Sequence, residues 1–312
     1  MHQISVVVPV KNDLSGMQRL LECLRKQTVE HELTVVDNGS TDGTVEFLVS
    51  QGINVLSFPE LRVGAMRNRG VEKTTAPYLA FADSDHEVYA DWLENGIRVL
   101  NSDPNIAACG SHYLAPEKGT WVQRVWAIHR LRGADLIDVD WLASGNLFVR
   151  RANFDAIGGF RENLVAAEDA DLCHRLKDQG GRIFLDQRIA SIHHGEARTV
   201  AHFIRKEWWR GSSGVYAWIS HGFPFQEFKS LVWPLWNLVF PILIPIALLI
   251  SLQYFSLSIV LSLLLLLVVF WILPSLALAT VVGKNATLVD KFLLAFLYSV
   301  YGVTRGLALF RK

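Results

Sequence analysis

Residues 78–85 read Tyr78-Leu79-Ala80-Phe81-Ala82-Asp83-Ser84-Asp85, an apolar run that ends in two carboxylates. In an extended strand, side chains two positions apart point to the same side, so Asp83 and Asp85 should converge where the strand ends. Open α/β sheets bind their ligands at this carboxyl edge. Carboxylate oxygens suit Mg²⁺ or Mn²⁺, which commonly bridge to substrate phosphates. The alternative is a solvated acidic turn that caps a helix beginning near Asp91.

Strand and helix patterns alternate on both sides of this stretch. Residues 4–10 form a continuous apolar run, typical of a strand buried on both faces. The other expected strands are 33–36, 53–58, 78–82, 106–109, 147–149 and 182–192. The expected helices are 14–27, 44–50, 63–73, 91–101, 151–157, 168–178 and 199–220. This order predicts an α/β fold with a mostly parallel sheet and helices on both faces. Residues 115–140 are expected to be less regular.

Composition divides the chain into two parts. Lys and Arg together number 30, as do Asp and Glu, so no global charge indicates a partner such as nucleic acid. Residues 1 to about 230 have the composition of a soluble domain, and residues 231–310 are overwhelmingly apolar. The scattered Cys23, Cys109 and Cys173 are typical of buried thiols in a reducing compartment. The chain enters a strand pattern at once, so no cleavable signal peptide is expected.

Three apolar segments follow residue 230. Residues 231–252 and 255–282 are each longer than the roughly 20 residues that cross a bilayer core, and their short link predicts a hairpin. In residues 290–310 a stripe recurs every seven positions, formed by Lys291, Tyr298, Arg305 and Lys312. This third helix is expected to lie in the membrane interface, or alternatively to span with its stripe packed against the hairpin. Basic residues lie on both sides of the hairpin: Arg205, Lys206, Arg210 and Lys229 before it, and Lys284, Lys291, Arg311 and Lys312 after it. The positive-inside rule then predicts that the preceding domain lies in the cytoplasm, at an inner or plasma membrane.

Polar, glycine-rich motifs follow the expected strands. They are Val7-Val8-Pro9-Val10, Val36-Asp37-Asn38-Gly39-Ser40-Thr41-Asp42-Gly43-Thr44, Gly64-Ala65-Met66-Arg67-Asn68-Arg69-Gly70 and Phe81-Ala82-Asp83-Ser84-Asp85. Later motifs are Gly145-Asn146-Leu147-Phe148-Val149-Arg150-Arg151, Gly158-Gly159-Phe160 and Glu168-Asp169-Ala170-Asp171-Leu172. In this order they resemble the motifs of family 2 glycosyltransferases. The resemblance covers residues 4 to about 195.

The resemblance implies a GT-A fold, an inverting reaction, an Mn²⁺ or Mg²⁺ cofactor and a UDP-, GDP- or dTDP-sugar donor. It implies nucleotide-sugar contacts from Pro9, Val10, Asn12, Asp37, Arg67, Asp83 and Ser84. It implies metal ligands at Asp83 and Asp85 and at one of His193 and His194, because neighbouring residues of a strand point in opposite directions. Of the two histidines we favour His193. It implies Asp169 as the general base and places Gly145, Asn146 and Glu168 beside the acceptor or donor sugar. Without the resemblance, Glu168 and Asp169 are simply acidic residues in a first helical turn.

The resemblance together with the apolar segments divides the chain into a catalytic domain (1–198), a juxtamembrane amphipathic region (199–230) and a membrane domain (231–312). Arg210 is a possible diphosphate contact, although the order Lys206-Glu207-Trp208-Trp209-Arg210 differs from the Gln-x-x-Arg-Trp motif of processive synthases. We therefore expect transfer of one sugar to a lipid-linked or membrane-proximal glycan. Two alternatives stay open: a polyprenyl-phosphate glycosyltransferase, and an inactive nucleotide-sugar-binding subunit of a membrane assembly.

Overall fold

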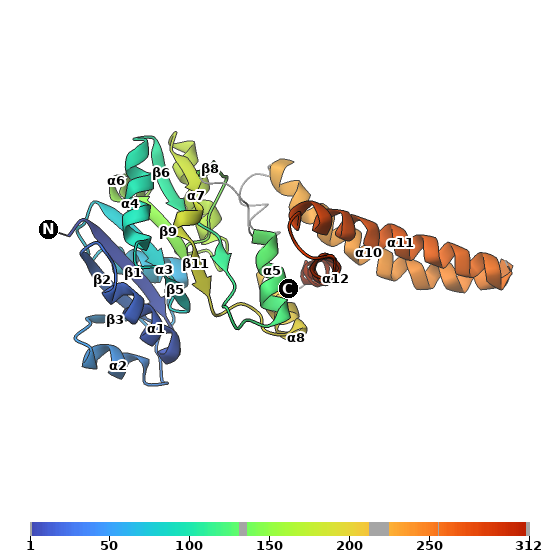
Figure 1. Ribbon diagram of the computed structural model, residues 1–312, viewed down its shortest axis with the longest axis horizontal. Helices are drawn as coiled ribbons and strands as arrows, with labels where there is room; N and C mark the ends of the chain where they lie inside the picture. Colours follow the sequence, from blue (N-terminus) through green and yellow to red (C-terminus); the bar gives the residue numbers. More distant parts are fainter. Residues whose placement is uncertain (1, 131–135, 212–224, 255, 310–312) are drawn as a thin grey trace. The chain divides into compact units, whose positions relative to one another are not determined.

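The computed structural model describes residues 2–130, 136–211, 225–254 and 256–309. The chain forms two compact units (Figure 1). The N-terminal unit comprises residues 1–117 and 131–196, and the C-terminal unit comprises residues 118–130 and 197–312. The predicted division at residues 198, 230 and 312 stays a prediction.

Strands and helices alternate through most of the N-terminal unit. Its strands are β1 (Ile4–Val10), β2 (His31–Asp37), β3 (Val55–Ser57), β4 (Tyr78–Ala82), β5 (His86–Val88), β6 (Ile106–Gly110), β7 (Tyr113–Leu114), β8 (Ile137–Asp138), β9 (Asn146–Arg150), β10 (Arg182–Leu185) and β11 (Ser191–His193). Its helices are α1 (Leu14–Arg25), α2 (Thr44–Ser50), α3 (Val63–Val71), α4 (Trp92–Ser102), α6 (Arg151–Ala156) and α7 (Glu168–Asp178), with a 3-10 turn at Gln187–Ile189.

The main sheet has the strand order β3-β2-β1-β4-β9-β6-β10-β8. The four strands from β3 to β4 pair in parallel, as does β6 with β10. β9 runs antiparallel to both of its neighbours, and β8 runs antiparallel to β10. The prediction of a mixed α/β fold with a mostly parallel sheet is confirmed.

Two apolar clusters cover the two faces of this sheet. Val6 and Val8 belong to the cluster that contains Trp92 of α4, whereas Val7 belongs to the cluster that contains Phe160. Alternate residues of a strand point to opposite faces, so β1 is buried along its whole length. A continuous apolar strand is what a central position between two helical layers requires.

A second, small sheet has the order β5-β11-β7. The predicted single strand over 182–192 is divided here, because Asp186 accepts a hydrogen bond from the Arg188 N–H and starts the 3-10 turn. The chain therefore leaves the main sheet after β10 and pairs again, through β11, with β5. This return strand brings residues 191–193 next to the segment that follows Asp83 and Asp85.

The C-terminal unit is helical. It contains α5 (Trp121–Arg130), α8 (Val200–Gly211), α10 (Phe225–Tyr254), α11 (Leu257–Val282) and α12 (Leu288–Ala308). The sequence expectation of irregular structure over 115–140 was wrong for α5, whose Val122, Val125 and Trp126 are buried at helical spacing. The expected helix over 199–220 is present as α8, and residues 212–220 lie outside the described residues.

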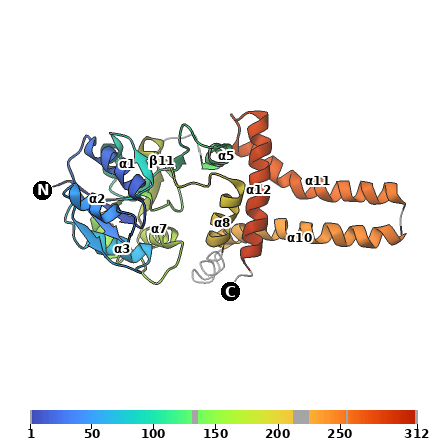
Figure 2. The same ribbon diagram turned by 90° about the horizontal axis from the view of Figure 1, so that it is seen from below.

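Two of these helices are long and apolar enough to cross a membrane. These helices cover Val232–Gln253 and Leu257–Val282. In the most apolar 18-residue stretch of each helix, only 11% and 6%, respectively, is buried within the protein. α12 runs across this hairpin and packs against α8, α10 and α11 (Figure 2). Of its expected stripe, Tyr298 is buried and Arg305 bonds to Glu207 of α8, so these residues face neighbouring helices. Lys312 lies outside the described residues.

Candidate functional site

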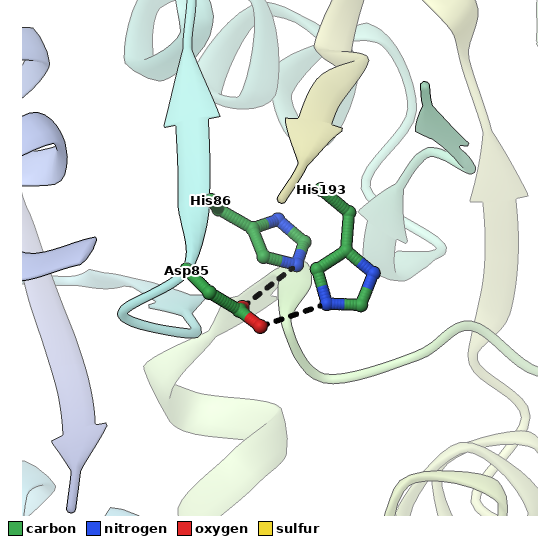
Figure 3. Close-up of side chains that lie close together, drawn as sticks. All are labelled: Asp85, His86 and His193. Carbon is green, nitrogen blue, oxygen red and sulfur yellow. Dashed lines mark hydrogen bonds and ion pairs between the residues drawn. The ribbon is translucent and has the colours of Figure 1, made fainter. Parts of the chain in front are cut away.

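Three side chains converge at the carboxyl edge of the main sheet. Asp85 and His86 follow β4, and His193 ends β11 (Figure 3). His193 Nε2 lies 3.0 Å from Asp85 Oδ2, and His86 Nε2 lies 3.9 Å from Asp85 Oδ1. One ligand atom from each residue lies within 4.8 Å of the others. A carboxylate and two imidazoles at such distances make a chemically suitable ligand set for a divalent cation.

The two histidines share one face because their strands are paired. His193 is the direct partner of His86 in the antiparallel register of β5 and β11. The other ring nitrogen of each histidine has its own partner: His86 Nδ1 lies 2.9 Å from Ser191 Oγ, and His193 Nδ1 lies 3.2 Å from Glu196 Oε1. Partners of this kind fix the tautomer and orientation of a metal-binding imidazole, so both Nε2 atoms are directed toward Asp85.

Glycines flank the cluster on two sides. A Cβ on Gly145 would lie 2.5 Å from Asp83 Oδ2 and 3.2 Å from His86 Nε2. A Cβ on Gly195 would lie 1.8 Å from Asp85 Oδ2 and 3.1 Å from His193 Nε2. Neither position has a positive φ, so the glycines keep space beside these ligand atoms rather than permitting an unusual backbone.

The electrostatics suit metal binding by His86. Burial lowers the pKa of the His86 imidazole to about 4, and the neighbouring His193 acts in the same direction. His86 is therefore neutral at pH 7, the form of histidine that binds metals. Burial disfavours charge on His193, but the hydrogen bonds to Asp85 and Glu196 outweigh burial and raise its pKa.

A buried polar atom also points to a ligand. His86 is fully buried, and its Nε2 has no hydrogen-bond partner among the described residues. Unsatisfied buried polar atoms are uncommon, and a site for an ion is one explanation for them. Together with the space kept by Gly145 and Gly195, this atom shows that the residues fit a divalent cation.

The predicted ligand Asp83 and the alternative ligand His194 are not part of the three-residue cluster. His194 Nε2 bonds to Glu87 Oε2 at 2.8 Å, away from Asp85, whereas His193 lies in the cluster. Asp83 Oδ1 accepts a hydrogen bond from Arg67 Nη2 at 2.8 Å, and Asp83 is not part of the three-residue cluster. The carboxylates of Asp83 and Asp85 thus bond to the side chains of Arg67 and His193. This differs from the alternative of a solvated acidic turn that caps the next helix.

Arg67 joins this region to the start of α7. Its guanidinium is almost completely buried and donates to Asp83 on one side and to Glu168 Oε1, at 3.0 Å, on the other. Arg67 thus holds the loop after β4 against the first turn of α7. The bidentate geometry of arginine suits such a bridge between two carboxylates. Its predicted contact with the nucleotide-sugar stays a prediction.

Asp169 follows in the same helical turn. Burial and the adjacent Glu168 carboxylate raise the pKa of Asp169 to about 7, although its Oδ1 accepts a hydrogen bond from the Ala170 N–H. Ala167, which precedes α7, has a φ of 63°. Left-handed backbone is uncommon for a residue other than glycine, and such conformations cluster at functional sites. A carboxyl with a pKa near neutrality is suited to accept a proton.

The loops after β1 and β2 are tied together. Asn12, with a φ of 51°, accepts a hydrogen bond from the Thr41 N–H at 2.7 Å, and its own N–H donates to Ser40 Oγ. The buried Asp37 carboxylate accepts hydrogen bonds from the Gly39 and Ser40 N–H groups. These bonds organise an edge loop beside the end of β1, where Pro9 and Val10 also lie. Their predicted nucleotide contacts stay predictions.

The remaining predicted residues have structural partners. Ser84 Oγ donates to Asp13, the N-cap of α1. Asn146 is buried. Its side-chain oxygen accepts a hydrogen bond from the Trp92 indole, and its side-chain nitrogen donates one to the Ile189 carbonyl, so both polar atoms of the side chain have partners within the unit. Arg210 belongs to the C-terminal unit, where it pairs with Glu207.

Sequence reasoning missed His86, Ser191, Gly195 and Glu196. His86 directly follows the acidic motif, and this adjacency was a usable signal. The partners of the two imidazoles depend on the pairing of β5 with β11, which no local pattern indicates.

Comparison with known proteins decides the family. Residues 5–160, half of the 312-residue chain, match the family model described as Glycosyl transferase family 2. The chain belongs to glycosyl transferase family 2. The family 2 chain is therefore an enzyme of the glycosyltransferase class, and the predicted family and class are confirmed.

Curated relatives agree with this assignment. Glycosyltransferase AglE of Haloferax volcanii is 26% identical over 247 residues, which cover 76% of this chain and 80% of that protein. Pre-mycofactocin glycosyltransferase of Mycobacterium tuberculosis is 31% identical over 228 residues, 69% of this chain and 47% of that protein. The family 2 chain thus spans about half the length of the second relative.

Solved structures share the fold. The mannosyltransferase PcManGT of Pyrobaculum calidifontis, solved with GDP-Man and Mn²⁺, aligns with 100% of this chain and 88% of its own, with a TM-score of 0.62 at 15% identity. S. aureus TarS 1-349 with UDP-GlcNAc covers 68% of this chain and 66% of its own, with a TM-score of 0.50 at 18% identity. At these identities the likeness shows a GT-A-like fold.

Proposed function

We propose that this chain moves one sugar, with inversion, from a nucleotide-sugar donor to a hydroxyl of a lipid-linked or membrane-proximal glycan. The observation that carries the proposal is the Asp85–His86–His193 cluster at the sheet edge, together with Arg67, which bridges Asp83 and Glu168. Family membership supplies the reaction class, and this geometry supports the residue roles proposed below.

Asp85, His86 and His193 would hold the divalent cation. When bound, such an ion neutralises charge that builds on the departing nucleoside diphosphate. Mg²⁺ is a hard cation that binds oxygen ligands almost exclusively, whereas the softer Mn²⁺ accepts imidazole nitrogen alongside a carboxylate. We therefore infer that Mn²⁺ serves better than Mg²⁺. PcManGT was solved with Mn²⁺, in line with this inference.

Asp169 would take the proton from the acceptor hydroxyl. Its pKa of about 7 matches this task, since a base is most effective when its pKa lies near the working pH. Arg67 keeps Glu168 paired and so holds the first turn of α7 in place. A single displacement assisted by one base inverts the anomeric carbon, by the logic of one-step glycoside hydrolysis.

The donor would enter over the loops after β1 and β2. Asn12 and Asp37 order these loops through bonds to backbone N–H groups, which leaves a preformed edge for the nucleoside. GDP-Man and UDP-GlcNAc occupy two structural relatives, so the nucleotide base of the donor is left to experiment. Asp83 and Ser84 would lie beside the ribose.

The helices α10 and α11 would anchor the enzyme. Few of their apolar side chains pack against the rest of the protein, whereas those of a core helix in a soluble protein are mostly buried. Burying such faces in lipid is favourable, because each apolar side chain gains about 1.5–3 kcal/mol when it leaves water. The basic residues around the hairpin favour a cytoplasmic catalytic unit at an inner or plasma membrane.

The test uses the full chain in detergent with Mn²⁺ and a lipid extract. UDP-, GDP- and dTDP-sugars carrying a radiolabel are offered in turn, and label in the lipid or glycan fraction is counted. Asp169→Asn and Asp85→Asn should abolish transfer in folded protein. Full transfer by either variant would refute the assigned roles.

The polyprenyl-phosphate alternative makes a different prediction. A phosphate acceptor is already ionised and needs little help from a base, so Asp169→Asn would retain most of its rate. The product would be a sugar phosphodiester, which mild acid cleaves. The raised pKa of Asp169 favours a hydroxyl acceptor.

A further inference from the structure

Tyr113 lies on the same face of the small sheet as the two histidines of the cluster. Its strand β7 pairs in parallel with β11, and Tyr113 is the direct register partner of Ser191. Ser191 and His193 are two positions apart on β11, so their side chains point to one side of that strand. His86 lies on the same side because it is the antiparallel partner of His193. The three strands β5, β11 and β7 therefore bring one tyrosine beside both imidazoles.

The ring of Tyr113 packs against both imidazoles. Its centroid lies 4.6 Å from that of His86 and 5.0 Å from that of His193, with interplanar angles of 89° and 63°. The two imidazole centroids are 4.7 Å apart, so each of the three rings has the other two as neighbours. Edge-to-face packing at such distances is favourable for aromatic rings. Tyr113 is half-buried and both histidines are buried, so the tyrosine ring covers part of the imidazole pair.

The hydrogen bond at each Nδ1 leaves some freedom to the imidazole ring. His86 Nδ1 lies 2.9 Å from Ser191 Oγ, and His193 Nδ1 lies 3.2 Å from Glu196 Oε1. A bond at Nδ1 holds that atom, but the ring can still tilt about it, and tilting moves Nε2. A ring packed against the imidazole restricts this motion, because ligand side chains are held in place by packing as well as by hydrogen bonds. Since one tyrosine contacts both imidazoles, it also fixes their spacing.

We propose that Tyr113 is a positioning residue of the candidate metal centre. Its ring holds the imidazoles of His86 and His193 at the spacing that a divalent cation requires, without contacting the ion. A tyrosine with a merely structural role would contribute to folding and leave the affinity for the ion unchanged. The inference rests on the proposed function and concerns the same site, so its test measures Mn²⁺ binding directly as well as sugar transfer.

The test is calorimetric titration of the full chain in detergent with MnCl₂, without nucleotide. Tyr113→Phe keeps the ring and should bind Mn²⁺ as tightly as the wild type does. Tyr113→Leu removes the ring but keeps an apolar side chain, and should weaken binding about tenfold, the lower end of the range for groups that support metal-binding histidines. Tyr113→Met, a second variant without the ring, should repeat the loss.

Tyr78→Leu is the matched control. Tyr78 is also half-buried, but it begins β4 and so lies at the opposite end of that strand from Asp85. Thermal melts should show that Tyr78→Leu and Tyr113→Leu both lose stability, whereas Mn²⁺ affinity should fall in Tyr113→Leu and stay unchanged in Tyr78→Leu. In transfer assays, Tyr113→Leu should need more Mn²⁺ than the wild type for half-maximal rate.

The outcomes separate the role of Tyr113 from the proposed function. Wild-type Mn²⁺ affinity in Tyr113→Leu, or an equal loss in Tyr113→Phe or Tyr78→Leu, would overturn the role of the Tyr113 ring alone. Absence of Mn²⁺ binding by the wild type would overturn the metal centre and this inference together. The expected pattern of Mn²⁺ binding without sugar transfer from any donor would support the role of Tyr113 and overturn the proposed function.

Discussion

His86 and His193 face each other across the antiparallel pair of β5 and β11, with ring centroids 4.7 Å apart. Directly opposed residues place their side chains on one face of a sheet. Because Asp85 immediately precedes β5, the same pairing brings its carboxylate to both imidazoles. The candidate metal centre therefore depends on a long-range strand pair as well as on the local acidic motif.

Glu196 should raise the affinity of this centre for a metal ion without binding the ion itself. It bonds to His193 Nδ1 and fixes the orientation of the ring. We expect Glu196→Gln to weaken Mn²⁺ binding about tenfold, the lower end of the range for partners of metal-binding histidines. Calorimetric titration with MnCl₂ measures the effect. Glu87→Gln, which alters the neighbouring pair with His194, is the control, and an equal loss there would contradict the orienting role.

The raised pKa of Asp169 predicts how the transfer rate depends on pH. With a pKa of about 7, its basic form accumulates as pH rises, so the transfer rate should increase through pH 7 and then level off. Asp169→Asn should lower the rate about 10²–10⁴-fold at pH 8. A flat profile between pH 6 and pH 8 in the wild type would contradict the assigned base.

The same pKa predicts an effect on stability. In the unfolded chain an aspartate ionises near pH 4, whereas folded Asp169 resists ionisation up to about pH 7. Wild-type stability relative to Asp169→Asn should therefore fall as pH rises from about 4 to about 7. Thermal melts at pH 5 and pH 8 measure this difference. A larger advantage of the variant at pH 5 than at pH 8 would have the wrong sign.

Arg67 and Arg69 lie on one helix and give a matched pair of substitutions. Arg67→Met leaves Asp83 and Glu168 without their shared buried cation, so it should cost about 3–5 kcal/mol of unfolding free energy. Arg69 pairs with Glu72 and another glutamate at the surface, and Arg69→Met should cost less than about 1 kcal/mol. Urea unfolding in detergent compares them, and equal costs would remove the bridging role.

The membrane hairpin can be tested by cysteine labelling. Ser256 lies in the link between α10 and α11, and Asn285 lies between α11 and α12; both are exposed. In intact cells a membrane-impermeant maleimide should label Ser256→Cys and leave Asn285→Cys unlabelled until the cells are opened. Labelling of both variants from outside would rule out the proposed cytoplasmic orientation.

Local sequence patterns predicted most of the N-terminal unit. β1, α2, β4 and α7 lie where the apolar periodicity and the turn residues place them. The strand period also predicted that Asp83 and Asp85 follow β4 at the sheet edge, but both lie in the turn after Ala82 and bond to different partners, Arg67 and His193. α5 was missed although Val122, Val125 and Trp126 carry helical spacing, because the surrounding residues show no regular pattern.

Local sequence patterns could not predict the contacts between residues far apart in the chain. No spacing in the sequence shows that β11 pairs with β5, so His86 was overlooked and the partners of His193 stayed unknown. The inward position of Tyr298 and Arg305 likewise depends on helices that pack across α12. A stripe of polar residues every seven positions identifies one face of a helix but not what covers that face.

The neighbouring histidines at positions 193 and 194 give the most direct test of the proposed metal centre. Both are paired with carboxylates, yet of the two it is His193 that lies in the cluster with Asp85. Mn²⁺ bound to the full chain without nucleotide is measured by the loss of the free-ion electron paramagnetic resonance signal. We predict that His193→Asn loses this binding and that His194→Asn keeps it. Retained binding in His193→Asn, or equal loss in both variants, would contradict the proposed site.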